Sequence, residues 1–219
     1  MSSPTMRELL RGLEVFAGEL PGFDPGAAPD DPVELFTDWL LRAVRAGVPE
    51  PHAMTLSTAD GDGEPSARVL ILKDVSPHGW QFASHSGSRK GRDLTQRPSA
   101  ALTFYWPAQA RQVRVRGRVT TAPPTDSAAD FLARGAAARA EALLGRQSRP
   151  LTDLPAREAA VKESLAALDR DPGLVAPGWT LYNLRAEQAE FWQGDRYRNH
   201  TRLDYRRVDG AWEKELLWP

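Results

Sequence analysis

The chain has 219 residues, with 28 Lys and Arg residues against 29 Asp and Glu residues and a formal net charge of −1. This balance argues against a general attraction to nucleic acid or to an anionic membrane. Cysteine is absent, which excludes disulfides and thiol catalysis and is typical of the reducing cytoplasm. The longest aliphatic run, Val69–Leu72, is far shorter than the roughly 20 residues of a membrane helix. We therefore expect a cytoplasmic protein with neither a nucleic acid nor a membrane partner.

The first 30 residues predict a flexible N-terminal arm, in which an amphipathic stretch precedes a linker rich in Pro, Gly, Ala and Asp. Asp31 followed by Pro32 is typical of a helix start, and Gly47 of a helix end. Between them, apolar residues recur at three- and four-residue spacing, as in a helix with one buried face. We treat residues 31–219 as one domain.

Beyond Pro51 the sequence alternates in the manner of strands. The turn signal Asp60-Gly61-Asp62-Gly63 predicts a hairpin. A helical, Ala- and Arg-rich region at 123–171 then separates two groups of strands. This order predicts an α+β fold, a mainly antiparallel barrel with helices around it. The expected strands are 53–59, 66–74, 80–84, 99–106, 111–120, 179–184, 189–193, 202–208 and 212–217.

Three stretches carry residues suited to chemistry. Ser86–Arg92 ends a strand and opens a helix, and its backbone N–H groups, Arg and Lys would suit a phosphate. Arg68–Lys73 is an apolar strand with a cation at each end, which needs solvent or an anionic partner. Trp192–Arg202 contains His200, which can transfer protons near neutral pH, and arginines that can hold anions.

Metal chemistry is not expected. The chain has only four His and no Cys, and no pair of His has the spacing of ligands on one helix, so we predict no metal site. A site rich in Arg, Lys, Gln and His suits a phosphorylated cofactor that supplies its own reactivity.

Taken in order, five separated motifs resemble the pyridoxine/pyridoxamine 5′-phosphate oxidase family from about Asp31 to Pro219. The resemblance implies an FMN-binding split β-barrel and a homodimer with FMN at the subunit interface. The motifs are Arg68–Lys73, Gly87–Lys90, Arg111–Val113, Arg146–Ser148, and Glu190–Gly194 with Arg198, His200 and Arg202.

The resemblance also implies residue roles. Substrate hydride would pass to FMN, which dioxygen would reoxidise with release of hydrogen peroxide. Basic side chains would hold the flavin phosphate, and amide side chains would face the ring. The implied FMN residues are Arg68, Val69, Leu70, Lys73, Ser84, Arg89, Lys90, Gln112, Gln147, Ser148, Trp192 and Arg202.

On the substrate side, the resemblance places Lys73, Arg134, Arg198 and His200 at substrate-binding positions, the last two as catalytic residues. Family members that act on vitamin B6 phosphates have a Tyr and a Ser where an ungapped alignment puts Asp130 and Ala138. An Asp repels a phosphate and an Ala donates no hydrogen bond, so we expect weakened binding of a phosphorylated substrate.

Other stretches resemble the FMN-dependent oxidases of phenazine biosynthesis, among them Gly47–Pro51, Ser84–Ser88 and Gly178–Leu184. The favoured hypothesis is therefore an oxidase of specialised metabolism acting on a reduced, nitrogen-containing ring with a carboxylate or phosphate. The first alternative is a working pyridoxine/pyridoxamine 5′-phosphate oxidase, to which Lys73 points. The second is a non-catalytic flavin-binding protein, against which Arg198 and His200 argue.

Overall fold

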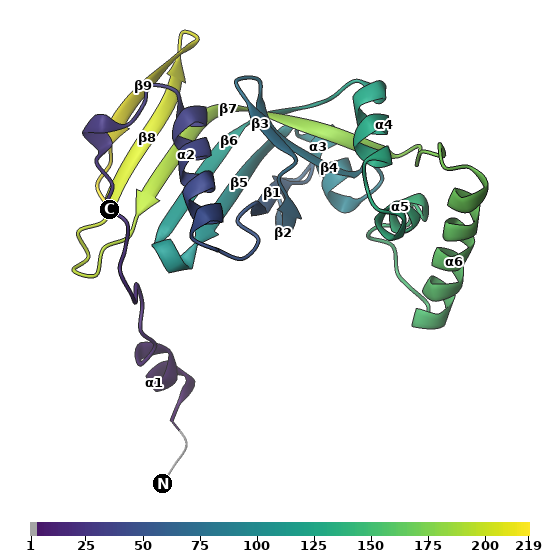
Figure 1. Cartoon of the computed structure of the whole chain (residues 1–219), viewed down its shortest axis with the longest axis horizontal. Coiled ribbons are helices and arrows are strands. Elements are labelled where there is room, and N and C mark those ends of the chain that lie inside the picture. Colours follow the sequence, from purple (N-terminus) through teal and green to yellow (C-terminus); the bar gives the residue numbers. More distant parts are fainter. Residues whose placement is uncertain (1–3) are drawn as a thin grey trace. The chain divides into compact units, whose positions relative to one another are not determined.

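Strands dominate the computed structural model, which describes residues 4–219 (Figure 1). The described helices are α1 Met6–Arg11, α2 Pro32–Arg45, α3 Arg89–Gln96, α4 Pro124–Leu132, α5 Ala136–Leu143 and α6 Leu154–Arg170. The strands are β1 Ala53–Ala59, β2 Pro65–Ile71, β3 Asp74–Ser76, β4 Gly79–His85, β5 Ser99–Trp106, β6 Arg111–Thr121, β7 Trp179–Gln193, β8 Thr201–Val208 and β9 Ala211–Leu216.

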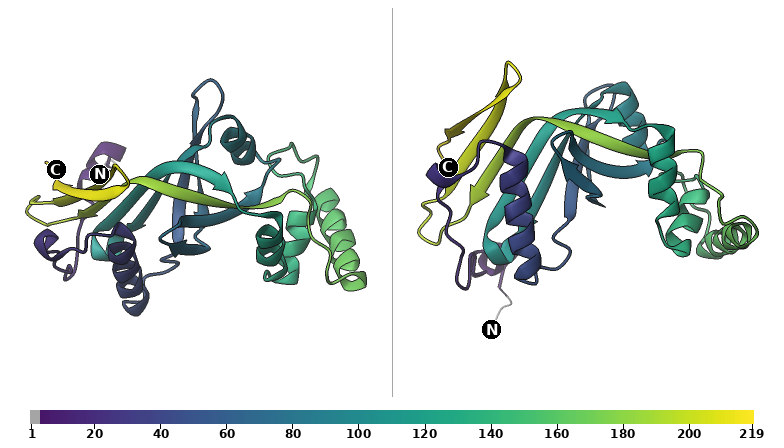
Figure 2. Two further views of the ribbon diagram at one scale, coloured as in Figure 1. Left: turned by 90° about the horizontal axis from the view of Figure 1, so that it is seen from above. Right: turned by 45° about the horizontal axis from the view of Figure 1, so that its top comes forward.

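The strands form one sheet in the order β2-β1-β5-β6-β7-β4-β3, and β8 pairs with both β7 and β9. The pairs β1–β2, β1–β5, β3–β4, β4–β7 and β8–β9 are antiparallel. The predicted hairpin at Asp60–Gly63 joins β1 to β2, with Ala59 opposite Pro65. The predicted fold class, an antiparallel split barrel of the α+β class, is confirmed (Figures 1 and 2).

Two compact units make up the chain. The first comprises the chain up to Pro51 with Phe104–Arg114 and Ala189–Pro219, and the second comprises His52–Thr103 and Val115–Gln188. Strands β5, β6 and β7 contribute residues to both units. The candidate site residues are described below within the unit to which they belong.

The core of the first unit is aromatic and is covered by α2. Asp31 caps this helix by accepting a hydrogen bond from the Val33 N–H at 2.8 Å, as predicted. From α2, Trp39 packs edge-on against Phe191 of β7 with ring centroids 5.3 Å apart, and Phe36 packs on Phe104 at 4.8 Å. Both α2 residues are almost completely buried. Such rings bury large apolar areas, so they stabilise the unit strongly.

In the second unit, most buried side chains lie on the strands, and a smaller buried cluster lies at the helices. Buried side chains alternate with half-buried ones along β1 and mostly with exposed ones along β6, which is typical of strands with one face in a core. Phe131, Ala142 and Ala176 form a buried cluster where α4 and α5 meet the chain before β7. Helices α5 and α6 lie side by side (Figure 2).

Two strand boundaries differ from the sequence-based expectation. The strands expected at 179–184 and 189–193 are one continuous strand, in which exposed Arg185 and Glu187 alternate with buried Leu184 and Ala186. The strand expected at 66–74 breaks after Ile71, because the backbone changes partner. The Leu72 N–H donates to the His52 carbonyl, whereas the next N–H donates to Gln81.

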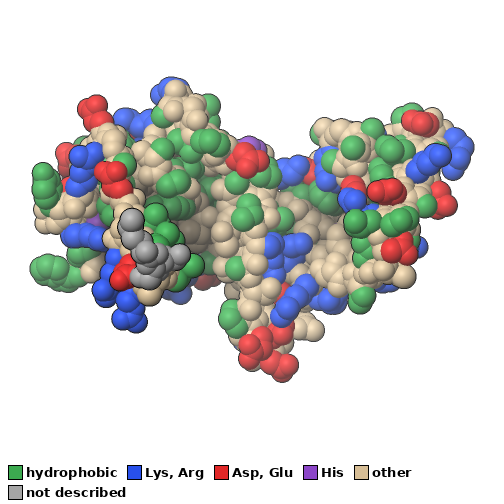
Figure 3. All heavy atoms as spheres, turned by 90° about the horizontal axis from the view of Figure 1, so that it is seen from below, with side chains coloured by type: hydrophobic (Ala, Val, Ile, Leu, Met, Phe, Trp, Pro, Cys, Tyr) green, Lys and Arg blue, Asp and Glu red, His purple; other side chains and the backbone are tan. Residues whose placement is uncertain are grey.

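The surface carries charges of both signs. On the face drawn in Figure 3, Lys and Arg side chains are interspersed with Asp and Glu. No helix among residues 4–219 is long and apolar enough to cross a membrane. The described part of the chain also brings together no group of three or more His, Asp or Glu side chains that could hold a metal ion.

Candidate active site

The start of α3 carries the first group of predicted site residues. The Ser88 hydroxyl caps the helix by accepting the Gly91 N–H at 3.2 Å, and it lies 3.3 Å from the Ser84 hydroxyl of β4. A Cβ at Gly91 would lie 2.2 Å from the Ser86 carbonyl oxygen, so the turn into the helix needs glycine here. The local sequence therefore places backbone N–H groups and two hydroxyls at one helix end, where an anion binds well.

Basic side chains of the same unit converge on this helix start. Lys90 donates to the Ser84 hydroxyl at 3.3 Å. Arg68 of β2 donates to the Thr58 hydroxyl at 2.8 Å and has one carboxylate nearby, that of Asp93 at 3.9 Å. Burial, and secondly the charge of Arg68, lowers the pKa of Lys90. With Arg89 on the same turn, cations outnumber the acid, which favours binding of an anion.

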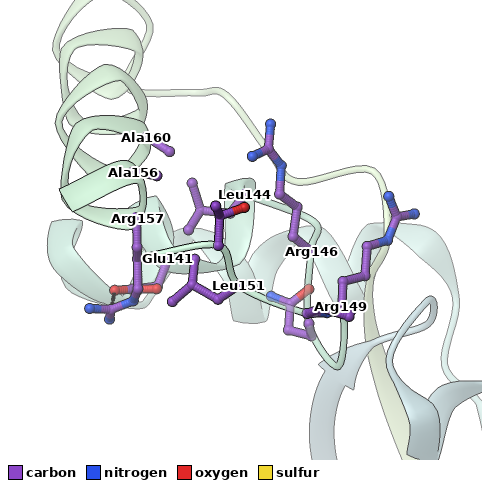
Figure 4. Close-up of a pocket in the computed structure, with 11 residues that line it drawn as sticks. Glu141, Leu144, Arg146, Arg149, Leu151, Ala156, Arg157 and Ala160 are labelled. Carbon is purple, nitrogen blue, oxygen red and sulfur yellow. Dashed lines mark hydrogen bonds and ion pairs between the residues drawn. The ribbon is translucent and has the colours of Figure 1, made fainter. Parts of the chain in front are cut away.

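A loop after α5 reaches the same helix start. The Arg89 N–H donates to the Ser148 hydroxyl at 3.1 Å. The neighbouring Gln147 has a buried side-chain oxygen with no hydrogen-bond partner among residues 4–219, and this oxygen can accept a ring N–H. The loop also borders a cavity of about 250 Å³ against α6, and Figure 4 shows Leu144 and Leu151 among the side chains that line it.

The side chains at the start of α3 have the charges and hydrogen-bonding groups that FMN needs. The surplus of cations and the capped helix start suit its phosphate, and the unpartnered amide oxygen suits its ring. The residues present fit the group. On β2, next to Arg68, Val69 is exposed and Leu70 is half-buried. Both residues are therefore accessible to a bound cofactor.

The second group surrounds Lys73, also in the second unit. The Lys73 ammonium lies 3.2 Å from one carboxylate oxygen of Asp130 on α4. The other oxygen of Asp130 accepts the Trp179 indole N–H at 2.7 Å. The Arg134 guanidinium stacks on the Trp179 ring at 4.0 Å from its centroid, and its Nη1 is buried with no hydrogen-bond partner in the described chain. Burial lowers the pKa of Arg134.

A third group lies in the first unit, in the loop between β7 and β8. The His200 ring lies 4.9 Å from the Trp192 ring and 5.6 Å from that of Phe16, which comes from the N-terminal arm. Arg198 is exposed and has a φ of +67°, a left-handed backbone that costs energy in a residue other than glycine. The structure thus brings Trp192 and His200 together.

Arg202 lies on β8 in the first unit and is held by a carboxylate. Its guanidinium donates two hydrogen bonds to Glu190 of β7, each at 3.1 Å, and one to the Trp218 carbonyl at 2.6 Å. Arg114 of β6 also pairs with Glu190. Burial raises the pKa of Glu190, but the hydrogen bonds and charges of the two arginines outweigh it and lower the pKa below its ordinary value. Gln112 is half-buried on β6.

The sequence-predicted residues therefore form separate groups, and several partners were missed. Trp179, Asp93, Thr58 and Glu190 each hold a predicted residue but were given no role. For Trp179 and Glu190 a signal existed, since both lie in stretches that carry the family resemblance. Thr58 and Asp93 could not be found from sequence, because 35 positions separate two side chains that meet at 2.7 Å.

Two family models match successive parts of the chain. That of pyridoxamine 5′-phosphate oxidase matches residues 40–166, more than half of the chain. The chain belongs to the pyridoxamine 5′-phosphate oxidase family. Residues 179–219 match the C-terminal dimerisation region of pyridoxine 5′-phosphate oxidase. The resemblance inferred from the five motifs is confirmed.

Individual members of the family are similar over most of their length. The pyridoxine/pyridoxamine 5′-phosphate oxidases of Pseudomonas putida and Ectopseudomonas mendocina are 41% and 42% identical over 200 residues, covering 90% of this chain and 93% of each relative. The crystal structure of PhzG from Burkholderia lata, in complex with tetrahydrophenazine-1-carboxylic acid, is 30% identical with a TM-score of 0.85, covering 92% of this chain and all of PhzG.

A more distant structure shows the fold alone. The FMN-binding protein of Nostoc punctiforme related to pyridoxamine 5′-phosphate oxidase is 21% identical, with a TM-score of 0.69, and covers 86% of this chain and 98% of its own. Membership of this oxidoreductase family, together with the fit of the helix start to a phosphate, supports FMN as the cofactor.

Proposed function

We propose that this protein is an FMN-dependent oxidase acting on a small, reduced, nitrogen-containing ring that carries a carboxylate, in specialised metabolism of the phenazine type. The single observation that carries the substrate choice is the position of Asp130, between Lys73 and the Trp179 indole. The PhzG likeness supports the same choice, because that protein was crystallised with a tricyclic carboxylic acid.

The cofactor would be held mainly in the second unit. Lys90, Arg89 and Arg68, with the hydroxyls of Ser84 and Ser148, would hold the FMN phosphate and ribityl chain, and Gln147 would accept a ring N–H. Bound there, FMN would supply a two-electron acceptor for the substrate's hydride, and dioxygen would regenerate it. The predicted contributions of Gln112, Trp192 and Arg202 belong to the first unit, and the family's dimerisation region supports a homodimer with FMN at the interface.

The charges around Lys73 favour a carboxylate over a phosphate. The group contains two cations, Lys73 and Arg134, and one anion, Asp130, so its formal charge is +1. A carboxylate balances this charge, whereas a phosphate monoester brings about −1.5 to −2 at neutral pH and would face Asp130 as well. The unpartnered Nη1 of Arg134 is a donor that a carboxylate oxygen can fill.

His200 and Arg198 are the proposed substrate clamp of the first unit. Arg198 would bind an anionic group of the substrate. His200, packed against two aromatic rings, would orient the substrate ring or hold a proton. Phe16 covers the same ring from the N-terminal arm, which would help to exclude water from the reacting atoms.

The alternative is a pyridoxine/pyridoxamine 5′-phosphate oxidase. It is supported by relatives of that activity with 41% and 42% identity over nine tenths of the chain. In this case a phosphate would have to displace Asp130 from Lys73.

The experiment is to measure peroxide release by the FMN-loaded protein with two substrates side by side, pyridoxine 5′-phosphate and a reduced phenazine carboxylic acid. We expect turnover of the carboxylic acid and at least tenfold lower kcat/KM for the phosphate ester. Efficient turnover of the phosphate ester alone would refute the proposal in favour of the alternative. A protein that binds no FMN would refute both.

A further inference from the structure

Asp195 organises the loop that carries Arg198 and His200. Its carboxylate accepts the N–H of Tyr197 at 2.8 Å and that of Asn199 at 3.1 Å. Its carbonyl accepts the Arg198 N–H at 3.2 Å. Short side chains that bond the backbone two residues on are a common way to stabilise a turn. Here the bonds from a single residue span the whole loop.

The loop needs this support because its backbone is strained. Arg198 has a φ of +67°, and such a conformation in a residue with a Cβ persists only where the surrounding contacts fix it. The contacts that Asp195 makes to the residues on either side of Arg198 do so. The carboxylate therefore helps to set the direction in which the proposed anion-binding side chain leaves the backbone.

The same residue bonds to the imidazole. The Asp195 backbone N–H donates to Nδ1 of His200 at 3.0 Å. A ring nitrogen that accepts a hydrogen bond carries no proton, so a neutral imidazole in this place carries its proton on Nε2. The Trp192 and Phe16 rings pack on the imidazole and hold its orientation.

We propose that Asp195 is a positioning residue that shapes the loop so that neutral His200 presents Nε2–H as a hydrogen-bond donor beside Arg198. A neutral His200 in this tautomer donates to the substrate and does not act as a general base through Nε2. The effect of this tautomer on turnover rests on the proposed function. The tautomer itself is a property of the protein without substrate.

The first test is nitrogen-15 NMR of the imidazoles at mildly alkaline pH, with His200→Gln used to assign the His200 signals. We expect an unprotonated Nδ1 and a protonated Nε2 in the wild-type protein. A protonated Nδ1 would overturn the proposal without any variant. Because this measurement needs no substrate, it stands or falls independently of the proposed reaction.

The second test compares Asp195→Ala with Asp195→Asn. The amide keeps an oxygen that can accept both N–H groups, so it should retain the tautomer and most of the activity. The alanine variant should give a mixture of tautomers and lower kcat/KM by about tenfold to a hundredfold. Asp171→Ala is the matched control, since Asp171 caps an exposed turn by accepting the Gly173 N–H at 3.0 Å.

An alanine variant with the wild-type tautomer and unchanged kcat/KM would overturn the proposed role of the carboxylate. Loss of turnover in the asparagine variant with the tautomer retained would also contradict it, because the charge and not the loop geometry would then matter. If the wild type has the expected tautomer but no carboxylated ring is turned over, the proposed function fails while the positioning role stands.

Discussion

Asp130 is the residue on which the proposed choice of substrate rests. Its two oxygens hold Lys73 and the Trp179 indole, and its side chain is only 14% exposed. The Lys73 side chain is 31% exposed, so water screens this ion pair in part, and breaking it costs less than breaking a fully buried pair. A second anion at Lys73 would therefore compete with a partner that is already in place.

Lys90 is expected to contribute to the affinity for FMN. Lys90→Ala should weaken FMN binding by about tenfold to a hundredfold, because a charge-assisted hydrogen bond contributes roughly 1.5–3 kcal/mol. Binding should be measured by quenching of FMN fluorescence. Lys162→Ala, which removes an exposed lysine from α6, should leave the affinity unchanged. Equal affinities for FMN in the wild type and both variants would show that Lys90 does not bind the phosphate.

The lowered pKa of Lys90 adds a pH dependence. Only the protonated ammonium attracts the phosphate, and burial lowers the pKa at which that proton is lost. The affinity for FMN should therefore fall as the pH rises through this lowered value, before an ordinary lysine would titrate. In Lys90→Ala the fall over the same pH range should be smaller, and an unchanged fall would assign it to another group.

The turn into helix α3 depends on one glycine, Gly91. A methyl group at Gly91 would lie 2.2 Å from the Ser86 carbonyl oxygen, so the backbone would have to move. Gly91→Ala should lower the free energy of unfolding by about 1–3 kcal/mol and weaken FMN binding together with it, as measured by urea titration and fluorescence. Gly22→Ala is the control, because nothing lies within 4 Å of a Cβ there. Wild-type stability in Gly91→Ala would show that α3 can start elsewhere.

The strands β6, β7 and β8 are tied together through Glu190. Its pKa is lowered by Arg202 and Arg114, so its contribution to stability is full above the ordinary carboxyl pKa and is lost as the pH falls through the lowered value. Between these two pH values the Tm of the wild type should fall more steeply than that of Glu190→Gln. Glu158→Gln removes one negative charge from an exposed position on α6, so its Tm should change with pH as steeply as that of the wild type. Equal slopes for all three would contradict the role of this carboxylate.

Considering the whole molecule, the sequence predicted the order of elements well because alternation and turn signals are local. The Asp31 cap and the Asp60–Gly63 hairpin needed only neighbouring residues. The continuity of β7 was missed because exposed polar residues at its middle look like a loop until the opposite face is seen buried. The Lys73–Asp130 pair joins positions 57 residues apart, and only the resemblance brought Asp130 into view.

The match of residues 179–219 to a dimerisation region predicts the assembly. Trp218, at 92% exposed, and Leu216, at 65%, are large apolar side chains of this region, and neighbouring exposed apolar side chains are typical of an interaction surface. We expect the mass of a homodimer in light scattering, and a lower mass or weaker dimer for Trp218→Ala. A wild-type monomer at micromolar concentration with FMN bound would contradict an interface site.

We propose that Asp130 weakens the binding of a phosphate at Lys73, and one binding measurement tests this directly. Pyridoxal 5′-phosphate is titrated into the FMN-loaded wild type, Asp130→Asn and Asp126→Asn, the last being an exposed change of the same charge on α4. We expect Asp130→Asn alone to bind pyridoxal 5′-phosphate at least about tenfold more tightly than the wild type. Equal and tight binding to all three proteins would contradict it and would favour the vitamin B6 phosphates as substrates.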